Sequence, residues 1–346
     1  MLRQFCSSVS HLRDQLRDND DIETVSAALL TAYETLDQQL SEEALAFVIG
    51  AEMSDVLAKA PRWDWQPWLA NSSERRKSLL HTATFSAAMS GAVVCTAHVS
   101  QGSVVVANTG DCQAVIGFLG EDGNWWPRKL SHEHTADNPS ETARLYSSHP
   151  RSEQDTILRS DRLLGQLMPL RAFGDFRFKW PRNVIEKYVV PLTSPSALPM
   201  HYKTPPYLTA RPEITHTAIG PRDKFLIIAS DGLWDMLSPT QVVRLVGEHM
   251  SGRVALGPLT LPPGDVTLNG VNELLRERKL GLSRRPLDTN AATHLIRHAL
   301  GGSDTGLDLH KLAELLTLPV DVVRLFRDDI SIVVAYFDTD SACTQR

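Results

Sequence analysis

The sequence predicts a mixed α/β fold on the basis of three observations. Apolar residues recur at helical spacing near both ends of the chain, in residues 22–60 and 290–316. Between and after these stretches lie short β-prone runs, and three of the runs are bounded by an aspartate. No internal repeat or low-complexity tract interrupts the pattern. The helices should therefore cover sheets whose strands carry carboxylates at their ends.

Composition places the chain among ordinary globular proteins. Its 346 residues carry a formal net charge of −6, with 42% apolar and 22% charged residues, which suits one large domain or two small ones. The mild acidic excess argues against nucleic acid as a partner, and no apolar run has the length needed to cross a bilayer. The four cysteines form no CxxC pair, so we expect buried thiols in a reducing compartment, with Cys95 and Cys112 in or beside strands.

The first 90 residues have a helical pattern. Residues 1–13 hold two arginines and no acid, which suits the end of a mitochondrial transit peptide; an amphipathic helix is favoured because acids follow at once. Residues 22–60 predict two helices, the second opening at Ser41. The tryptophan-rich stretch 63–73 predicts a loop, and a short helical pattern ends at residues 90–91. One face of the first helix should carry Val25, Leu29, Tyr33 and Leu36.

Strands follow. Residues 92–98 and 103–107 predict a hairpin around Gly102, and residues 114–118 predict a third strand. Asp111 lies beside Gly110 at the end of the second strand. Further on, Asn138 and the proline after it predict a helix N-terminus.

The stretch 225–237, FLIIASDGLWDML, predicts a buried strand that ends in Asp231 and Gly232. A carboxylate at the end of an apolar strand is costly unless it is solvated, paired or bound to a metal ion. Helix capping is the alternative role, but Ser238 with Pro239 and Gln241 makes the better cap downstream.

Two stretches of the sequence predict irregular insertions. Residues 181–210 are rich in proline, serine and threonine and predict a surface excursion. Residues 253–287 predict a second insertion with a solvated basic patch. The chain closes with Asp328 and Asp329 before a strand at 330–337, and we expect one domain over 1–346 with its core at about 22–338. The patch comprises Arg276, Arg278, Lys279, Arg284 and Arg285.

Asp111, Asp231 and Asp328 form the kind of ligand set that Mg²⁺ or Mn²⁺ prefers. Zinc would call for clustered histidines and cysteines, and the pairs His132 with His134 and His294 with His298 lack a cysteine pair. Hard cations bind phosphate esters and lower the pKa of bound water, so phosphate hydrolysis is the natural reaction class. Aspartates at strand ends also cap helices and close turns, so a purely structural role for these aspartates is the alternative.

The order of the motifs resembles that of the metal-dependent type 2C protein serine/threonine phosphatases. The similarity is closer still to the family branch that acts on mitochondrial pyruvate dehydrogenase, and it runs from about the first helices to Phe337. The strings that carry it are SG (90–91), ANTGDCQA (107–114), LSHEHTADNPSE (130–141), RAFGD (171–175), ASDGLWDML (229–237) and DDISIVV (328–334), with DRLLGQLMPLRAFGDFRFKW (161–180), PPYLTARPEI (205–214) and NAATHLIRHALG (290–301) for the branch.

The resemblance implies two mainly antiparallel β-sheets in a layered sandwich flanked by helix pairs. It implies that Asp231 and Asp328 hold a metal ion of a binuclear Mg²⁺ or Mn²⁺ centre, and that Asp111 with Asp231, helped by Asp235, serves a weaker site. Asp329 replaces the family's usual asparagine, as in the pyruvate dehydrogenase branch.

Other residues are expected near the site without a catalytic role. Arg171 and Asp175 belong to one motif, in which Arg171 is interpreted as structural rather than phosphate-binding, and Gly232 follows the metal aspartate. His134 is expected to stabilise its loop. No side chain is assigned as nucleophile, because the resemblance implies that a metal-activated water attacks phosphoserine.

The sequence also departs from the family, since it contains no Asp-Gly-His string, the motif that supplies the bridging aspartate. Two interpretations compete: an N-terminally incomplete chain of an active phosphatase, lacking the first strands and with a reduced metal centre, or a catalytically impaired product that acts as a binding or regulatory protein. The first is favoured because the downstream aspartates are present. The expected partners are a phosphoprotein of the pyruvate dehydrogenase complex and a regulatory subunit, in the mitochondrial matrix.

Overall fold

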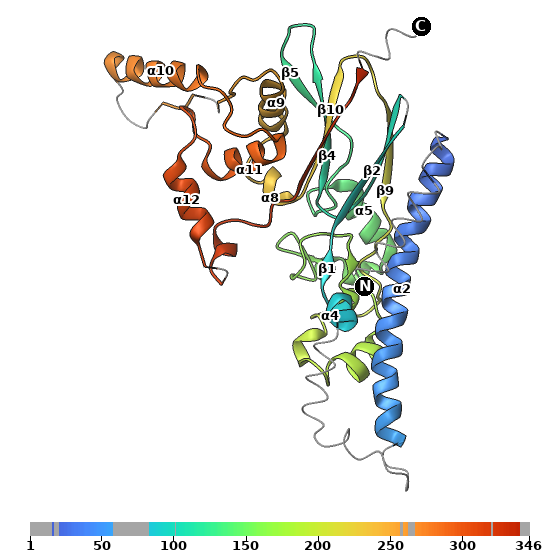
Figure 1. The fold of residues 1–346 in the computed structure, drawn as a ribbon. Helices are drawn as coiled ribbons and strands as arrows, with labels where there is room; N and C mark the ends of the chain where they lie inside the picture. Colours follow the sequence, from blue (N-terminus) through green and yellow to red (C-terminus); the bar gives the residue numbers. More distant parts are fainter. Residues whose placement is uncertain are drawn as a thin grey trace. The chain divides into compact units, whose positions relative to one another are not determined.

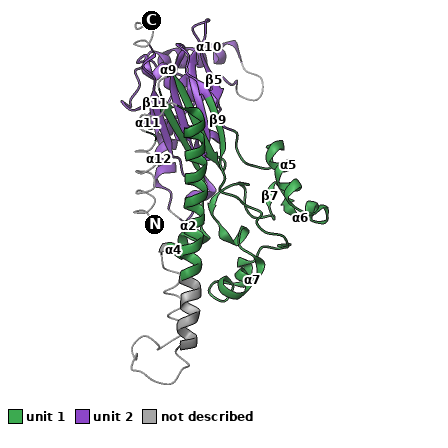
Figure 2. Ribbon diagram, turned by 90° about the vertical axis from the view of Figure 1, so that its right-hand side faces the viewer, with its two compact units in different colours: residues 1–111, 132–216 green, residues 112–131, 217–346 purple. Residues whose placement is uncertain are grey.

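The computed structural model describes residues 16, 21–57, 83–100, 102–256, 259–261, 267–319 and 321–339. The predicted loop at 63–73, Cys6 and Cys343 lie outside these residues. The chain divides into two compact units that alternate along the sequence (Figure 2). Unit 1 comprises residues 1–111 and 132–216, and unit 2 comprises residues 112–131 and 217–346. The single domain over 1–346 stays a prediction.

Unit 1 begins with a single long helix, α2 (Ile22–Leu57), where the sequence predicted two (Figure 1). The predicted break was wrong because Ser41 does not cap a new helix. Its hydroxyl instead accepts a hydrogen bond from the Trp180 indole at 2.7 Å, and the Gln38 amide donates to Glu42 one turn further on. The predicted apolar face is correct: Val25, Leu29 and Tyr33 are buried, and Leu36 packs beside them.

The sheet of unit 1 has the order β2-β3-β9. Strands β2 (Val94–Ser100) and β3 (Ser103–Thr109) form the predicted antiparallel hairpin. Tyr33 of α2 packs on this sheet and donates a hydrogen bond to the Ala107 carbonyl. The third strand is β9 (Glu213–Ala218), whose first residues belong to unit 1.

The remaining elements of unit 1 are short. α5 begins after Asn138, whose side chain accepts a hydrogen bond from the Ser140 amide as the sequence predicted. The helices are α4 (Ala83–Met89), α5 (Pro139–Ser148), α6 (Gln154–Ile157) and α7 (Arg182–Val184), with helical turns at 151–153, 176–178, 185–189 and 195–197, and the short strands pair as β1 (Gly91–Ala92) with β8 (Phe173–Gly174) and β6 (Leu158–Arg159) with β7 (Arg162–Leu163).

The predicted surface excursion at 181–210 instead helps to build the core of unit 1. Ile185, Val189, Tyr202 and Tyr207 are fully or almost fully buried and pack in one apolar cluster with residues of α4 and α5. The Tyr207 hydroxyl donates to the buried Glu153 carboxylate. The prediction was wrong because these isolated apolar residues show no regular period and become recognisable as core only when distant segments pack on them.

Unit 2 is built on a four-stranded antiparallel sheet of order β11-β10-β4-β5. The central strand is β10 (Asp223–Ala229), and its pairing runs Ala229 with Ile332 and Phe225 with Tyr336 on one side. Its other strands are β4 (Gln113–Leu119), β5 (Trp125–Lys129) and β11 (Ile332–Tyr336). The sequence did not predict β5, because Pro127 argues against a strand; the structure tolerates this proline because β5 is an edge strand.

Helices of unit 2 follow β10. α9 (Pro239–Met250) begins with the predicted capping box, in which Ser238 and Gln241 bond reciprocally, and its buried valines face the sheet. The predicted irregular insertion at 253–287 contains a well-formed helix, α10, because Thr267 caps it. The helices are α8 (Asp231–Trp234), α9, α10 (Leu268–Leu282), α11 (Ala291–Gly301) and α12 (Leu309–Thr317), with a turn at 323–325. Within the described part of the chain, none of the helices is both long and apolar enough to cross a membrane.

Candidate functional site

Asp231 and Asp328 lie at the same edge of the unit 2 sheet. Asp231 begins α8 two residues after the last residue of β10, and Asp328 precedes the first residue of β11 by four. Because Ala229 pairs with Ile332, both segments leave the sheet at one end. Ser230 ties them together: its hydroxyl donates to the Asp329 carbonyl and accepts from the Ser331 amide, both at 3.0 Å.

The backbone of Gly232 lies too close to the Asp329 carbonyl for any residue other than glycine to fit without a shift. A Cβ atom there would lie 2.5 Å from the Asp329 carbonyl oxygen, so any side chain would push the Asp328 segment away. The Gly232 amide donates to the Asp231 carboxylate at 2.8 Å, and the Asp329 amide donates to the Asp328 carboxylate at 2.7 Å. Backbone donors thus orient both carboxylates. Sequence reasoning missed Ser230, whose role depends on a segment 99 to 101 residues away.

Electrostatics at this edge favour a cation. Partial burial raises the pKa of the Asp231 carboxyl, and the negative charges of Asp328 and Asp235 raise it further, while the bond from the Gly232 amide lowers it. Within the described residues, neither Asp231 nor Asp328 forms an ion pair with a lysine or arginine. Asp329, an exposed side chain, lies 4.0 Å from Arg324.

This donor set fits a hard divalent ion that keeps most of its water. Mg²⁺ is commonly bound by one or two carboxylates together with several waters, and Asp231 and Asp328 supply two oxygen-donor side chains. Across residues 21–57, 83–256 and 267–339, gaps excepted, no three His, Cys, Asp or Glu side chains gather closely enough to form a metal site. Unit 2 therefore offers a pair of ligands rather than a complete cage.

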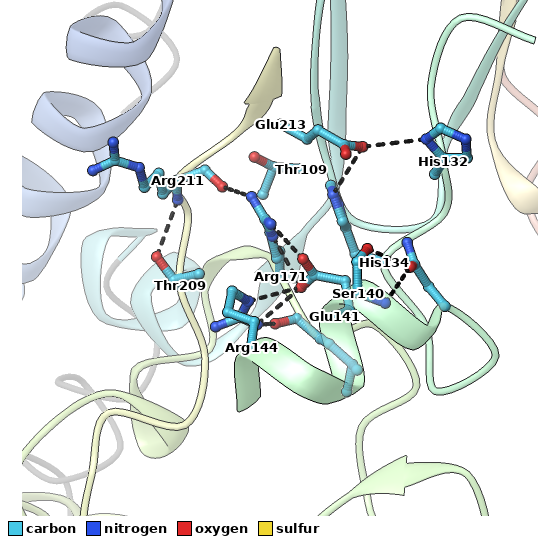
Figure 3. Close-up of polar contacts among 12 residues, drawn as sticks. Thr109, His132, His134, Ser140, Glu141, Arg144, Arg171, Thr209, Arg211 and Glu213 are labelled. Atoms are coloured by element: carbon cyan, nitrogen blue, oxygen red, sulfur yellow. Dashed lines mark hydrogen bonds and ion pairs between the residues drawn. The ribbon is translucent and has the colours of Figure 1, made fainter. Parts of the chain in front are cut away.

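Asp111 belongs to unit 1, two residues after the end of β3, and is buried. Its loop is held by His134, which is fully buried and whose Nδ1 accepts a hydrogen bond from the Gly110 amide at 3.1 Å. The His134 amide donates back to the Gly110 carbonyl. Since Nδ1 is an acceptor, the ring proton sits on Nε2, which faces Glu213 at 3.7 Å (Figure 3). These contacts are those of the loop-stabilising role predicted for His134. That Asp111 shares a metal centre with Asp231 stays a prediction.

Arg171 is committed to a buried carboxylate. Its guanidinium donates through Nε and Nη2 to the two oxygens of Glu141, and through Nη1 to the Arg211 carbonyl at 2.9 Å (Figure 3). Arg144 adds a second charge beside Glu141. Burial raises the pKa of the Glu141 carboxyl, but the bonds and charges of Arg171 and Arg144 outweigh it and hold the pKa below its usual range. That Arg171 is structural rather than phosphate-binding stays a prediction.

Asp175 is buried in unit 1 with a left-handed backbone, φ 47°. Its carboxylate fills the space beside Gly91, where a Cβ atom would lie 2.0 Å from Oδ2. Burial raises its pKa, against the charges of Arg177 and Lys179. Asp175 therefore packs against the backbone at Gly91, within unit 1.

A cleft of about 380 Å³ lies along α2 in the same unit and was not predicted. Asp37 lines this cleft. Its carboxylate accepts two hydrogen bonds from the Lys179 ammonium, each at 2.8 Å, and one from the Gly174 amide. The Asp37 and Lys179 side chains are nearly buried and paired with each other. They fix α2 against the segment 172–180 and are not free to bind a ligand.

Comparison with known proteins gives a consistent family assignment. The family model described as Protein phosphatase 2C matches residues 4–259. The chain is 44% identical over 270 residues to "[Pyruvate dehydrogenase [acetyl-transferring]]-phosphatase 1, mitochondrial" of Homo sapiens, an alignment that covers 76% of this chain and 50% of that protein. It is 44% identical over 261 residues to phosphatase 2 of the same name and organism, covering 73% of this chain and 49% of that protein.

A more distant relative is "Protein phosphatase 2C homolog C10F6.17c" of Schizosaccharomyces pombe, 43% identical over 237 residues, covering 68% of this chain and 50% of that protein. Among solved structures, the serine-threonine phosphatase 2C of Toxoplasma gondii aligns with 96% of this chain and 75% of its own at 16% identity and a TM-score of 0.42. The chain spans about half the length of the curated relatives it matches. The family model covers well over half of this sequence, and the chain belongs to the protein phosphatase 2C family.

Proposed function

We propose that this chain acts as a metal-dependent protein serine/threonine phosphatase. The observation that carries the proposal is the convergence of Asp231 and Asp328 at one sheet edge, with backbone amides orienting both carboxylates and no basic partner among the described residues. Family membership supplies the reaction class. The impaired, purely binding product is the less favoured alternative, because the aspartates of the downstream motifs are in place.

The proposed chemistry assigns a task to each residue. Asp231 and Asp328 would hold Mg²⁺ or Mn²⁺. That Asp111 with Asp231, helped by Asp235, serves a weaker third site stays a prediction from the family resemblance. When bound, the ion supplies the positive charge that binds a phosphate ester and acidifies a water molecule for attack on phosphorus. Ser230 and Gly232 keep the two ligand segments together. Asp329 follows Asp328 in the same segment, and a position of Asp175 and Arg171 near the site stays a prediction.

The substrate proposed is a phosphoserine protein of the pyruvate dehydrogenase complex, in the mitochondrial matrix, with a regulatory subunit as a further partner. The support is the name carried by the relatives above, which are described as mitochondrial pyruvate dehydrogenase phosphatases.

The test uses the 346-residue chain with a phosphoserine peptide and Mn²⁺. Phosphate release should depend on Mn²⁺, and Asp231→Asn or Asp328→Asn should lower the rate on the order of 100-fold, because each removes a ligand charge. Asp321→Asn, at an exposed aspartate of the same unit, is the matched control and should leave the rate unchanged. Calorimetry with Mn²⁺ separates the two parts of the proposal: binding that Asp231→Asn abolishes, without turnover, would support the ligand assignment and refute the activity of this chain.

A further inference from the structure

The helix α10 presents an exposed apolar face that the proposed function does not use. Leu268, Leu275 and Leu282 are 85%, 47% and 44% exposed. They are seven residues apart, so at about 100° per residue they fall within roughly 40° of one another around the helix axis. These three side chains are called the leucine face below. Exposed apolar stripes of this kind mark binding surfaces more often than chance.

One flank of α10 packs on unit 2 and leaves the leucine face outside that contact. Gly281 is buried, and a Cβ atom there would lie 2.3 Å from the Thr305 carbonyl oxygen and 3.2 Å from Leu256. Arg278 donates to the Asp304 carbonyl. Arg278 and Gly281 lie about 60° and 120° from Leu275 around the helix axis. This flank therefore fixes the helix to unit 2, and the three leucines stay exposed.

The acidic side chains of α10 lie away from the leucine face, on the side that also carries the exposed Leu280, about 140° from Leu275. Residues 268–287 contain five basic and two acidic side chains, a net charge of +3 in a chain whose net charge is −6. Lys279 lies next to the leucine face, about 40° from Leu275, and Arg276 about 100° from it. The acidic Glu273 and Glu277 lie about 160° from Leu275, to either side. Exposed Arg284, Arg285 and Leu287 continue the same mixture beyond the helix end.

We propose that the leucine face of α10, with Lys279, Arg276 and the arginines that follow, binds the surface of an anionic lipid bilayer. Apolar side chains flanked by cations, with the acids turned away, are the features of helices that lie in the interface of a membrane. The leucines enter the acyl boundary, and the lysine and arginine stems reach the lipid phosphates. A protein partner with an acidic surface is the alternative occupant, and binding to vesicles of defined lipids separates the two.

The test is sedimentation of the full chain with phosphatidylcholine vesicles prepared with and without phosphatidylglycerol. The chain should sediment with the anionic vesicles and stay in solution with pure phosphatidylcholine. The double variant Leu275→Gln with Leu282→Gln should weaken partitioning at least tenfold, and Arg276→Gln with Lys279→Gln should do the same. Glutamine favours helix, so α10 should persist in the circular dichroism spectrum.

The control pair is Leu316→Gln with Leu325→Gln, which removes two exposed leucines of unit 2 outside α10 and should leave partitioning unchanged. Failure of the wild-type chain to bind anionic vesicles would overturn the proposal and is the result expected if the face serves an acidic protein. Equal binding to both lipids, or an equal loss in the control pair, would overturn it too. None of these readouts depends on phosphatase activity.

Discussion

At the scale of single residues, the candidate site depends on backbone approach as much as on carboxylates. Ser230 and Gly232 contribute no charge, but they set the distance between the Asp231 and Asp328 segments through two hydrogen bonds and one missing Cβ. A substitution beside a ligand should therefore act on the metal affinity without altering either carboxylate.

Gly232→Ala tests that idea. The added methyl group must displace the Asp329 carbonyl, so Asp328 moves and the affinity for Mn²⁺ should fall by roughly tenfold or more. The measurement is calorimetric titration. Gly220→Ala is the matched control, because its Cβ would meet only an ordinary contact of 3.6 Å, and its affinity should match that of the unaltered chain. Equal affinities for both variants would contradict the assignment of Gly232.

The ion pair of Arg171 with Glu141 gives a second residue-scale prediction. The two side chains are only 12% and 3% exposed, so Glu141→Gln leaves a buried guanidinium without its charge partner. The free energy of unfolding should drop by about 3 kcal/mol, measured by urea denaturation. Arg182→Gln breaks the exposed pair with Glu186 and should cost less than about 1 kcal/mol. Similar losses of unfolding free energy in the two variants would contradict a larger contribution from the buried pair.

At the scale of elements, helix α11 carries two buried histidines. His294 is 1% exposed, and neither of its ring nitrogens has a hydrogen-bond partner among the described residues. Its ring packs against those of His298 and His249, with Asp288 3.8 Å from Nδ1 and Arg297 bonded to Asp288. The pKa values of His294 and His298 are both lowered to about 4, chiefly by burial; at His294 the charges of His298 and His249 add to this effect, and Asp288 opposes it.

These shifts predict acid sensitivity. An unfolded histidine has a pKa of about 6.5, so between that pH and about 4 the unfolded chain binds more protons than the folded one. The contribution of these neutral rings to the free energy of unfolding is complete above pH 6.5 and declines as the pH falls toward 4. At pH 5 the loss is on the order of 1–2 kcal/mol per histidine.

The measurement is the urea midpoint at pH 7.5 and pH 5. Replacing both residues, by His294→Leu with His298→Leu, should reduce the difference between the two midpoints. His310→Leu on α12 removes an exposed histidine and serves as the control. A double variant as acid-sensitive as the unaltered chain would refute the role of α11.

At the scale of the whole molecule, each unit has a hydrophobic core of its own. In unit 1, one apolar cluster joins α2 to the hairpin and a second joins α2, α4 and α5 to the segment 181–210, whereas the core of unit 2 lies between the sheet, α9 and α11. The ligand pair Asp231 and Asp328 belongs entirely to unit 2. A bound cation should therefore stabilise the folded chain.

Adding Mn²⁺ at about 100 times its dissociation constant should raise the free energy of unfolding by about 2.7 kcal/mol, because the ion binds the folded chain alone. Thermal denaturation with Mn²⁺ and with a chelator measures the difference. The shift should vanish in Asp231→Asn and persist in Asp321→Asn. An equal shift in both variants would mean that the ion acts elsewhere on the chain.

The sequence alone determined what depends on neighbouring residues. The caps at Asn138 and Ser238 were predictable because their bonds span two or three positions, and the strand that ends before Asp231 was predictable from its unbroken apolar run. The order of motifs indicated the family before any coordinates, and the match of the family model confirmed it.

Only the tertiary structure decided the rest, because the partners are distant in sequence. α2 runs through Ser41 as one helix with Trp180 bonded to that hydroxyl, 139 residues away, and Arg171 is held by Glu141 across 30 residues. Residues 181–210 have no regular period, and their tyrosines are buried only by packing against other segments. Local patterns carry no information about such contacts, since their free energy arises when separate parts of the chain meet.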